Sequence, residues 1–490
     1  MTLRRPVLVT VTAALVALVL AGCSGASVPP QRDLSTDVPF TACTPAVCEG
    51  SLDGAAFTIA MPTTWNGTLL IYSHGYRYAQ PAPPSFAPVA TDAQAASDEA
   101  TAATLLSQGY ALAGSAYRSN GWAVADGVAA AEGLHDYFTE KVAEPKRVLL
   151  WGDSLGGLIT QVTAEKHPEW VDGAAPLCGA VAGVVPNMNL ALDLSYAVKT
   201  LINPDLKLTG YASYEEAVKN WTDTMELVVA AASDTSGGGT AKVLYIADLV
   251  DAPSQTRTFD GASVQSKVKA TVEALATGLG YATFARYDLE DRFGGNPSGN
   301  EGVDYSARIS ESEAALIDAV TPGAVARFDA QLAAGTRVQA DPAATAKALA
   351  EGGDPKGAIT RPEITLHTAS DPLVIVQNET FLRDRFLAQQ QSGAATADLV
   401  QLYTVAPTSY SETAGAPYGA GHCNFTSQSR VAVIGLLNDW VQKGVYPGSA
   451  AIAAAMGDSS GYVAGWTPGP VSYTHLRAHE TVLDLVCRLL

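Results

Sequence analysis

The chain has 490 residues, of which 47% are hydrophobic and 16% are charged, and its formal net charge is -19. This length and apolar content are enough for a large buried core. The acidic balance, without a basic patch, argues against nucleic acid as a partner. No metal-ligand spacing and no glycine-rich nucleotide loop is found, so the sequence predicts neither a metal ion nor a cofactor.

Residues 1–22 have the pattern of a signal peptide. Arg4 and Arg5 precede an apolar run over residues 7–20, which is short for a membrane span. The run ends in Leu-Ala-Gly before Cys23 and resembles the bacterial lipobox, which implies cleavage there and lipidation of Cys23. We therefore expect export and anchoring on the outer face of the cell membrane. The alternative is an ordinary secretory signal cut nearby, giving a secreted protein.

Residues 23–51 are rich in Ser, Pro and Thr and show no periodicity, which predicts a lipid-anchored tether. Cys43 and Cys48 are close enough in the sequence to form a small disulfide loop. At the other end, residues 471–490 look like a translated sequencing-library adapter, and we exclude them from the interpretation. Residues 447–470 then form a C-terminal extension.

Residues 52–178 alternate apolar β-branched runs with amphipathic stretches. This alternation predicts an α/β fold, with a mainly parallel, doubly wound sheet that has helices on both faces. Ligands bind such sheets at the carboxyl ends of the strands. The expected strands are 56–62, 68–72, 110–116, 147–150 and 171–178, and the expected helices are 98–108, 122–142 and 158–165.

The alternation stops over residues 179–359, where helical segments and glycine-rich breaks dominate. We interpret this stretch as a large, mostly helical cap or lid insertion. Within it, the loop 296–300 either contacts substrate or only provides turn residues. The alternation resumes over residues 360–446, which predicts the second part of the core, with strands ending at Asp371 and over 398–405 and helices at 378–391 and 428–441.

The most informative motif is Gly152-x-Ser154-x-Gly156, which lies between an expected strand and an expected helix. In that context the pattern predicts a nucleophile elbow, a tight turn that lifts the serine hydroxyl clear of the sheet. The two glycines lack the Cβ atom that would clash across the turn. Ser154 is therefore the candidate nucleophile.

A serine nucleophile needs a base and a carboxylate that orients it. His422 lies in the loop after the last expected strand, and Asp371 ends the strand before that one. Asp398 and Glu412 are alternatives for the acid, although neither ends a buried strand. His367, four residues before Asp371, is expected to be a packed residue.

The order Ser154, Asp371, His422 resembles that of the α/β-hydrolase fold, which residues 55–178 and 360–445 would form. The resemblance implies an oxyanion hole made by the backbone amides of Leu155 and of Tyr76.

Cys423 follows the candidate base, and Cys178 ends the strand after the one that carries the nucleophile. Both approach the same edge of the sheet, so we expect a Cys178–Cys423 disulfide, with two buried thiols as the alternative. Tannase and feruloyl-esterase enzymes also have a cysteine after the catalytic histidine, paired with one just before the serine. Here Asp153 occupies that position, so the resemblance is confined to the histidine loop.

These features predict an exported serine hydrolase that cleaves small-molecule or oligomeric carboxylic esters through an acyl-enzyme. A serine peptidase with the same triad is the second hypothesis. Secreted aminopeptidases of this fold often have His-Gly-Gly-Pro-Gly in the oxyanion loop, whereas this chain has His74-Gly75-Tyr76-Arg77. The third hypothesis is an inactive surface-binding lipoprotein.

Overall fold

The computed structural model describes residues 49–469, except 235, 237 and 411–416. The expected signal peptide, Cys23, the Cys43 and Cys48 pair and residues 471–490 lie outside this part of the chain. None of the helices in the described ranges is both long and apolar enough to cross a membrane.

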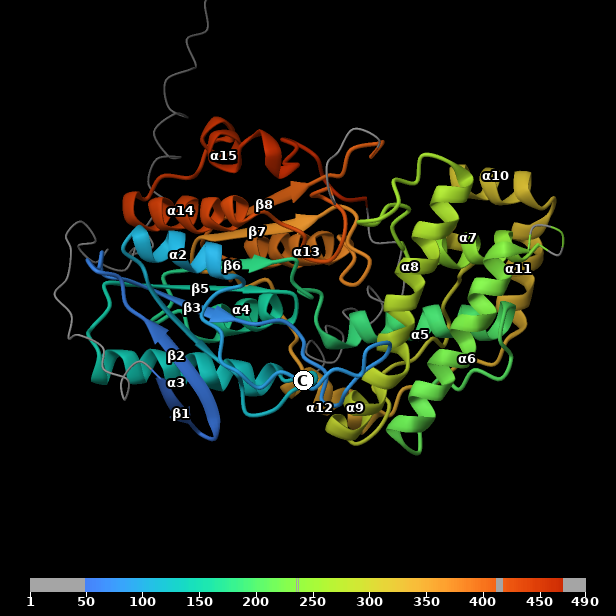
Figure 1. The fold of residues 1–490 in the computed structure, drawn as a ribbon, viewed down its shortest axis with the longest axis horizontal. Coiled ribbons are helices and arrows are strands. Elements are labelled where there is room, and N and C mark those ends of the chain that lie inside the picture. The colour runs from blue at the N-terminus through green and yellow to red at the C-terminus, as the bar shows by residue number, and fades with distance from the viewer. Residues whose placement is uncertain (1–48, 235, 237, 411–416, 470–490) are drawn as a thin grey trace, which may run out of the picture.

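An eight-stranded sheet has the order β1-β2-β4-β3-β5-β6-β7-β8 (Figure 1). Strands β1 and β2 pair antiparallel, as do β2 and β4, and the other neighbours pair parallel. This confirms the expected mainly parallel sheet. The strands are β1 (Glu49–Leu52), β2 (Ala55–Ala60), β3 (Thr68–Ser73), β4 (Ala111–Ser115), β5 (Arg147–Asp153), β6 (Gly173–Leu177), β7 (Glu363–Thr368) and β8 (Leu399–Thr404).

Strand β1 differs from expectation, because residues 49–51 were assigned to the tether. They form a hairpin with β2 instead. Its turn contains Asp53 and Gly54, which both have positive φ, at 48° and 83°. Asp-Gly is a strong signal for such a two-residue turn. The signal is present in the sequence, but the polar character of residues 49–51 obscured it.

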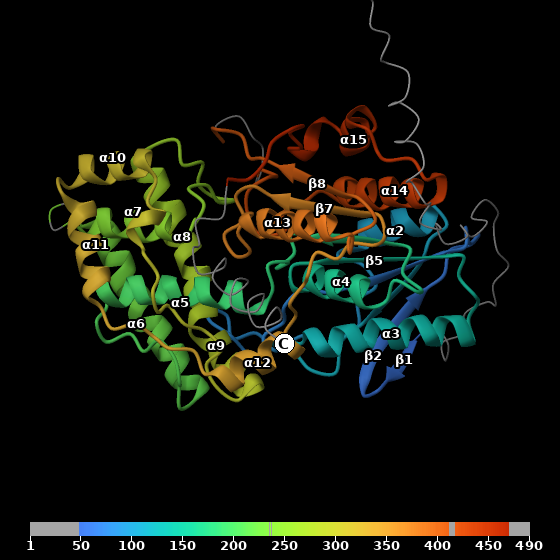
Figure 2. The same ribbon diagram turned by 180° about the vertical axis from the view of Figure 1, so that it is seen from behind.

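Helices cover both faces of the sheet because neighbouring strand residues point to opposite sides. Leu70 packs in one cluster with Leu105 of α2 (Glu99–Ser107), whereas Leu69 packs in another with Phe138 of α3 (Val124–Lys141). The first face also carries α14 (Ser427–Lys443) and α15 (Ser449–Met456), and the second carries α4 (Leu155–Lys166). Helix α13 (Gln377–Ser392) lies beside β7 and β8 (Figure 2).

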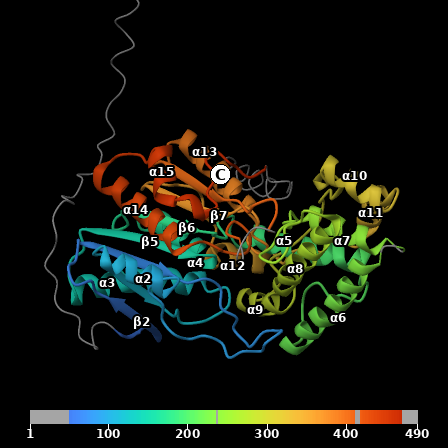
Figure 3. The same cartoon turned by 45° about the horizontal axis from the view of Figure 1, so that its top comes forward.

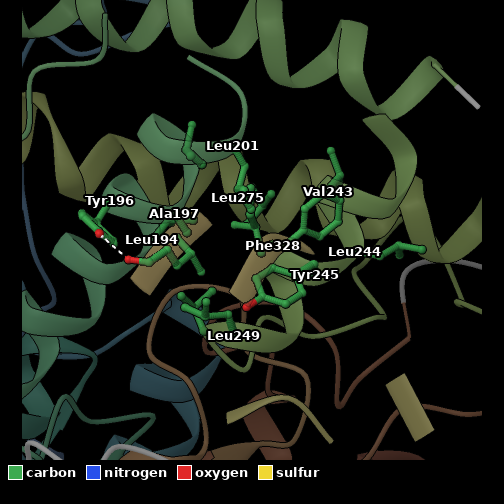
Figure 4. Close-up of a cluster of buried hydrophobic side chains, with 14 of the residues drawn as sticks. Leu194, Tyr196, Ala197, Leu201, Val243, Leu244, Tyr245, Leu249, Leu275 and Phe328 are labelled. Carbon is green, nitrogen blue, oxygen red and sulfur yellow. Dashed lines mark hydrogen bonds between the residues drawn. The ribbon is translucent and has the colours of Figure 1, made fainter. Parts of the chain in front are cut away.

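Residues between β6 and β7 form helices, as expected, and these lie at one end of the sheet (Figure 3). Most of them share a hydrophobic cluster of their own, which includes Leu194, Tyr245, Leu275 and Phe328 (Figure 4). The helices are α5 (Val184–Leu201), α6 (Tyr214–Ser233), α7 (Gly239–Leu249), α8 (Val264–Ala282), α9 (Phe284–Phe293), η1 (Ser306–Arg308), α10 (Glu311–Val320), α11 (Ala324–Ala334) and α12 (Pro342–Glu351).

The described part of the C-terminal extension packs against the edge of the sheet. Helix α15 is followed by η2 (Asp458–Ser460), and Tyr462 then forms an antiparallel bridge with Thr404 of β8. The ring of Trp466 lies 5.0 Å from that of Tyr403. Residues after β8 therefore cover the outer strand, which would otherwise expose an unpaired edge.

Candidate active site

Ser154 occupies a sharp turn between the end of β5 and the start of α4. Its backbone has φ 64° and ψ -121°, in the region that non-glycine residues rarely adopt. A Cβ atom on Gly152 would lie 2.5 Å from the carbonyl oxygen of Ser73, and one on Gly156 would lie 1.9 Å from it. The turn therefore requires glycine at both positions, which is the arrangement that the motif predicts.

The three residues of the expected triad meet at the carboxyl edge of the sheet. His422 Nε2 lies 2.8 Å from Ser154 Oγ. His422 Nδ1 lies 2.8 Å from Asp371 Oδ2 and 3.0 Å from Oδ1. Ser154 and Asp371 are buried, whereas the His422 side chain retains 25% of its exposure. The hydroxyl, imidazole and carboxylate thus form one continuous hydrogen-bonded chain.

Asp371 is held as a carboxylate by its partners. Burial on its own would raise its pKa, but contact with His422 and with the backbone lowers the pKa below the ordinary value. The amides of Leu373 and Val374 donate to Oδ1 at 2.9 and 3.0 Å. Of the alternative acids, Asp398 immediately precedes β8, at the opposite end of the strand, and Glu412 lies outside the described residues.

The expected oxyanion residues lie beside the nucleophile. Leu155 and Tyr76 line the same pocket as Ser154. The Cβ position of Gly75, between His74 and Tyr76, is 3.2 Å from Ser154 Cβ, so this loop passes directly against the serine. The neighbouring His74 ring stacks on Tyr117, with centroids 3.9 Å apart. Burial, aided by Arg77, lowers the pKa of His74 to about 4.

The expected disulfide between Cys178 and Cys423 is present, with the Cα atoms 5.4 Å apart. It ties the His422 loop to the end of β6. Cys423 Sγ lies 3.5 Å from His422 Nε2. Among the described residues, Cys178, Cys423 and His422 form the one cluster with the geometry of a metal site, and the disulfide occupies both of its sulfur atoms.

Sequence reasoning missed a charged pair that joins the nucleophile turn to the His422 loop. Arg430 Nη2 lies 3.6 Å from Asp153 Oδ2, which also accepts a hydrogen bond from the Tyr72 hydroxyl at 3.1 Å. Arg430 further donates to the carbonyl oxygens of Phe425 and Cys423, at 2.9 and 3.1 Å. A carboxylate at the end of a buried strand needs a partner, but nothing in the sequence indicates that Arg430 is the partner of Asp153.

A pocket that is partly open to solvent contains Ser154 and extends between α5 and α8 of the insertion. Its described lining carries no charged side chain and few polar ones. Such a surface favours an uncharged, apolar group. The insertion residues that line it are Asn187, Met188, Leu190, Ala191, Leu194, Val250, Ala252, Ala274, Leu275, Gly278 and Tyr281.

The strand order, the nucleophile turn after β5 and the positions of Asp371 and His422 after β7 and β8 define an α/β-hydrolase fold with a Ser-His-Asp arrangement. No family model matches the chain, and no curated protein matches it.

Among solved structures, the chain is similar to feruloyl esterase B from Aspergillus oryzae at 15% identity, covering 81% of this chain and 80% of that one, with a TM-score of 0.36. It is similar to an esterase from the same organism at 15% identity, covering 81% and 79%, with a TM-score of 0.38. A proline iminopeptidase from Mycobacterium smegmatis is 11% identical, with 81% and 98% covered and a TM-score of 0.35. These likenesses are too distant to indicate an activity.

Proposed function

We propose that this chain is a serine hydrolase that cleaves carboxylic esters. The observation that carries the proposal is the unbroken chain of hydrogen bonds from Ser154 through His422 to Asp371. Ser154 Oγ attacks the acyl carbon while His422 Nε2 takes its proton. The ester C–O bond then breaks, and the same proton passes to the departing alcohol. A water molecule then attacks the acyl-enzyme in the same way, with His422 again taking the proton, and the carboxylic acid is released.

Charge that develops on the carbonyl oxygen during these steps needs fixed donors. The amides of Leu155 and Tyr76 are the proposed donors, since both residues line the pocket beside Ser154. Removing one donor of this kind typically costs about 2.7–4 kcal/mol of barrier stabilisation. Asp371 keeps His422 in the tautomer that presents Nε2 to the serine, because its carboxylate accepts from Nδ1.

The acyl group is proposed to lie in the pocket between α5 and α8, where the described lining carries no charge. An aminopeptidase substrate has a protonated amine close to the scissile bond, and such a group needs a carboxylate or several acceptors when it is buried. The charge-free lining therefore supports an ester with a neutral acyl group over an aminoacyl amide. The peptidase with the same triad remains the second candidate.

Export and lipid attachment at Cys23 are also part of the proposal. They are supported by the pattern of residues 1–23. A structural disulfide is compatible with an oxidising compartment. Radiolabelled palmitate incorporation, compared between the wild-type chain and Cys23→Ser, tests the lipid anchor directly. Equal labelling of the two chains would contradict it.

The decisive experiment is labelling with a fluorophosphonate, followed by mapping of the adduct. We expect one adduct on Ser154 and none in Ser154→Ala. Ser370→Ala is a matched control, because Ser370 is as buried as Ser154, at 8% against 7%, and lies next to Asp371. An adduct elsewhere, or none at all, would contradict the hydrolase proposal and favour the inactive binding protein.

A panel of p-nitrophenyl esters and aminoacyl-p-nitroanilides then separates the two enzyme hypotheses. We expect kcat/KM for the esters to exceed that for the anilides well beyond the ratio for their spontaneous hydrolysis. A preference for anilides with a free amino group would instead identify a peptidase.

A further inference from the structure

His367 lies directly behind the proposed catalytic acid and is fully buried. It belongs to β7, and its ring faces α13. Its Nδ1 atom lies 3.1 Å from Glu379 Oε1, and its Nε2 atom lies 2.9 Å from the carbonyl oxygen of Val374. Both ring nitrogens therefore have a partner, and the ring orientation is fixed.

The partners define the protonation state of this ring. The Val374 carbonyl is only an acceptor, so Nε2 must carry a proton. Glu379 Oε2 already receives hydrogen bonds from Thr365 Oγ1 at 2.6 Å and from Gln401 Nε2 at 2.7 Å. Because Gln401 Nε2 is only a donor, Oε2 acts here as an acceptor, and Oε1 is left to face the ring. Nδ1 then donates to Oε1, and His367 is an imidazolium.

The imidazolium also faces Asp371. Its Nε2 atom lies 3.8 Å from Asp371 Oδ2, the oxygen that accepts from His422 Nδ1. Val374 links the two groups a second time, because its carbonyl accepts from His367 while its amide donates to Asp371 Oδ1. The position and the charge of the Asp371 carboxylate are therefore both tied to His367.

The other groups near His367 and Asp371 do not add a charge that would change the protonation state of the His367 ring. Burial raises the pKa of Tyr403, which pairs with His367 from the neighbouring β8, and also that of Tyr281, which lies near Asp371, so both hydroxyls stay neutral. The adjacent strand β6 pairs Leu177 with Leu366 and is followed by Cys178, which is held in the disulfide and carries no charge. Burial opposes a charge on His367, but the hydrogen bond to Glu379 outweighs it, and the pKa of His367 is raised. One imidazolium thus lies between two carboxylates.

We propose that His367, held as an imidazolium by Glu379, is a positioning residue that orients the Asp371 carboxylate behind His422 and compensates its charge. The residue does not touch substrate. It acts through Asp371, whose negative charge is stabilised by His422 on one side and by His367 on the other. This inference rests on the proposed hydrolase function for its kinetic consequences, but the protonation state itself does not.

The first test is Glu379→Gln, which keeps the size of the side chain and removes the carboxylate that holds the proton on His367. We expect kcat to fall about 10- to 100-fold with little change in KM. The acid limb of the kcat/KM profile should move to higher pH, because the hydrogen-bonded pair of Asp371 and its histidine loses the nearby cation that favours its deprotonated form. An unchanged kcat and pH profile would overturn the proposal.

Glu363→Gln is the matched control. Glu363 is as buried as Glu379 and lies on β7, the strand of His367, but at its opposite end. We expect its pH profile to equal that of the wild type. Equal shifts in both variants would mean that loss of any buried carboxyl near β7 has this effect, which contradicts a specific role for the His367–Glu379 pair.

The double variant His367→Gln with Glu379→Gln separates charge from packing. It restores a neutral pair that can hydrogen bond, so it should recover part of the stability that His367→Gln loses. The acid limb of its kcat/KM profile should still lie at higher pH than that of the wild type. A double variant with a wild-type pH profile would show that packing alone matters and would refute the proposal.

A spectroscopic readout is independent of activity. Nitrogen-15 NMR of the histidine rings in the full-length protein should show His367 protonated at both nitrogens at pH 7, and Glu379→Gln should abolish this signature. A neutral His367 in the wild-type protein would overturn the inference even if ester hydrolysis were confirmed. An inactive wild-type protein with a doubly protonated His367 would instead refute only the hydrolase function.

Discussion

Arg430 holds the residue that precedes the nucleophile, with its guanidinium 3.6 Å from the carboxylate of Asp153. The same guanidinium binds the carbonyl oxygen of Cys423, next to the proposed base. The turn that carries Ser154 and the loop that carries His422 are therefore joined through one side chain. Burial raises the pKa of Asp153, and Arg430 opposes this shift.

Replacing Arg430 with Met should destabilise the fold strongly, because it leaves Asp153 buried without its cation. We expect a loss of about 3–5 kcal/mol in the free energy of unfolding, measured by urea denaturation. Adding Asp153→Asn should recover part of that loss. Arg118→Met is the control, since Arg118 pairs with Asp126 at the surface and its side chain is 70% exposed. It should change stability by less than about 1 kcal/mol.

The Cys178–Cys423 disulfide should stabilise the fold and keep His422 in place. The double variant Cys178→Ser, Cys423→Ser is expected to lose about 2–5 kcal/mol of unfolding free energy, and its kcat should fall as well. Treatment with a thiol reductant should convert the wild-type protein to the behaviour of the variant and leave the variant itself unchanged. A reductant effect of the same size on both proteins would contradict this role.

Gly156→Ala should abolish activity and lower stability by at least about 3 kcal/mol, because the new Cβ meets the backbone of Ser73 and cannot be accommodated by a side-chain shift. Gly133→Ala in α3 provides the opposite case. Its Cβ would meet nothing within 4 Å. This helix substitution should stabilise the protein by about 0.5–1 kcal/mol with unchanged activity. Thermal unfolding and ester hydrolysis measure both effects.

His74 should make the protein less stable in mild acid. In the folded state burial lowers its pKa to about 4, from the ordinary value of 6.5 in an unfolded chain. Below pH 6.5 this histidine binds a proton in the unfolded chain but stays neutral in the folded chain. The free energy of unfolding therefore falls as the pH drops toward 4. The difference of about 2.5 units corresponds to about 3 kcal/mol. His74→Phe keeps the ring stack on Tyr117 and should flatten this part of the stability curve.

Gly278→Val should narrow the proposed acyl pocket between α8 and α5. A Cβ at this position lies 2.6 Å from Leu194 Cδ2, and both residues line the pocket. We expect the ratio of kcat/KM for the octanoyl ester to that for the acetyl ester to fall at least about fivefold. An unchanged ratio would show that the acyl chain lies elsewhere.

Most of the sheet could be predicted from sequence because its central strands are buried on both faces and read as short apolar runs. The run before Ser154 is an example. The positions of Ser154 and Asp371 followed from the same runs, since each lies at the end of one, and His422 followed from its place in the loop after the last run. Strand β1 was not predicted because three of its four residues, 49–51, are exposed and lack apolar side chains, and only the Asp53-Gly54 turn marked it.

The contacts that support the site could not be predicted in the same way. Arg430 reaches Asp153 across 277 positions of the chain, and neither residue stands out in its own segment. His367 was expected to be a packed residue, and it is fully buried as expected. Its ion pair with Glu379 depends on how α13 returns over β7, which no local pattern encodes. Such pairings come from tertiary packing rather than periodicity.

The 268 positions between Ser154 and His422 also have a consequence for synthesis. During translation Ser154 is synthesised long before His422, and the whole helical insertion is synthesised between them. A nascent chain thus carries its nucleophile without a base, and the hydroxyl remains an ordinary alcohol until the last strand and loop have joined the sheet.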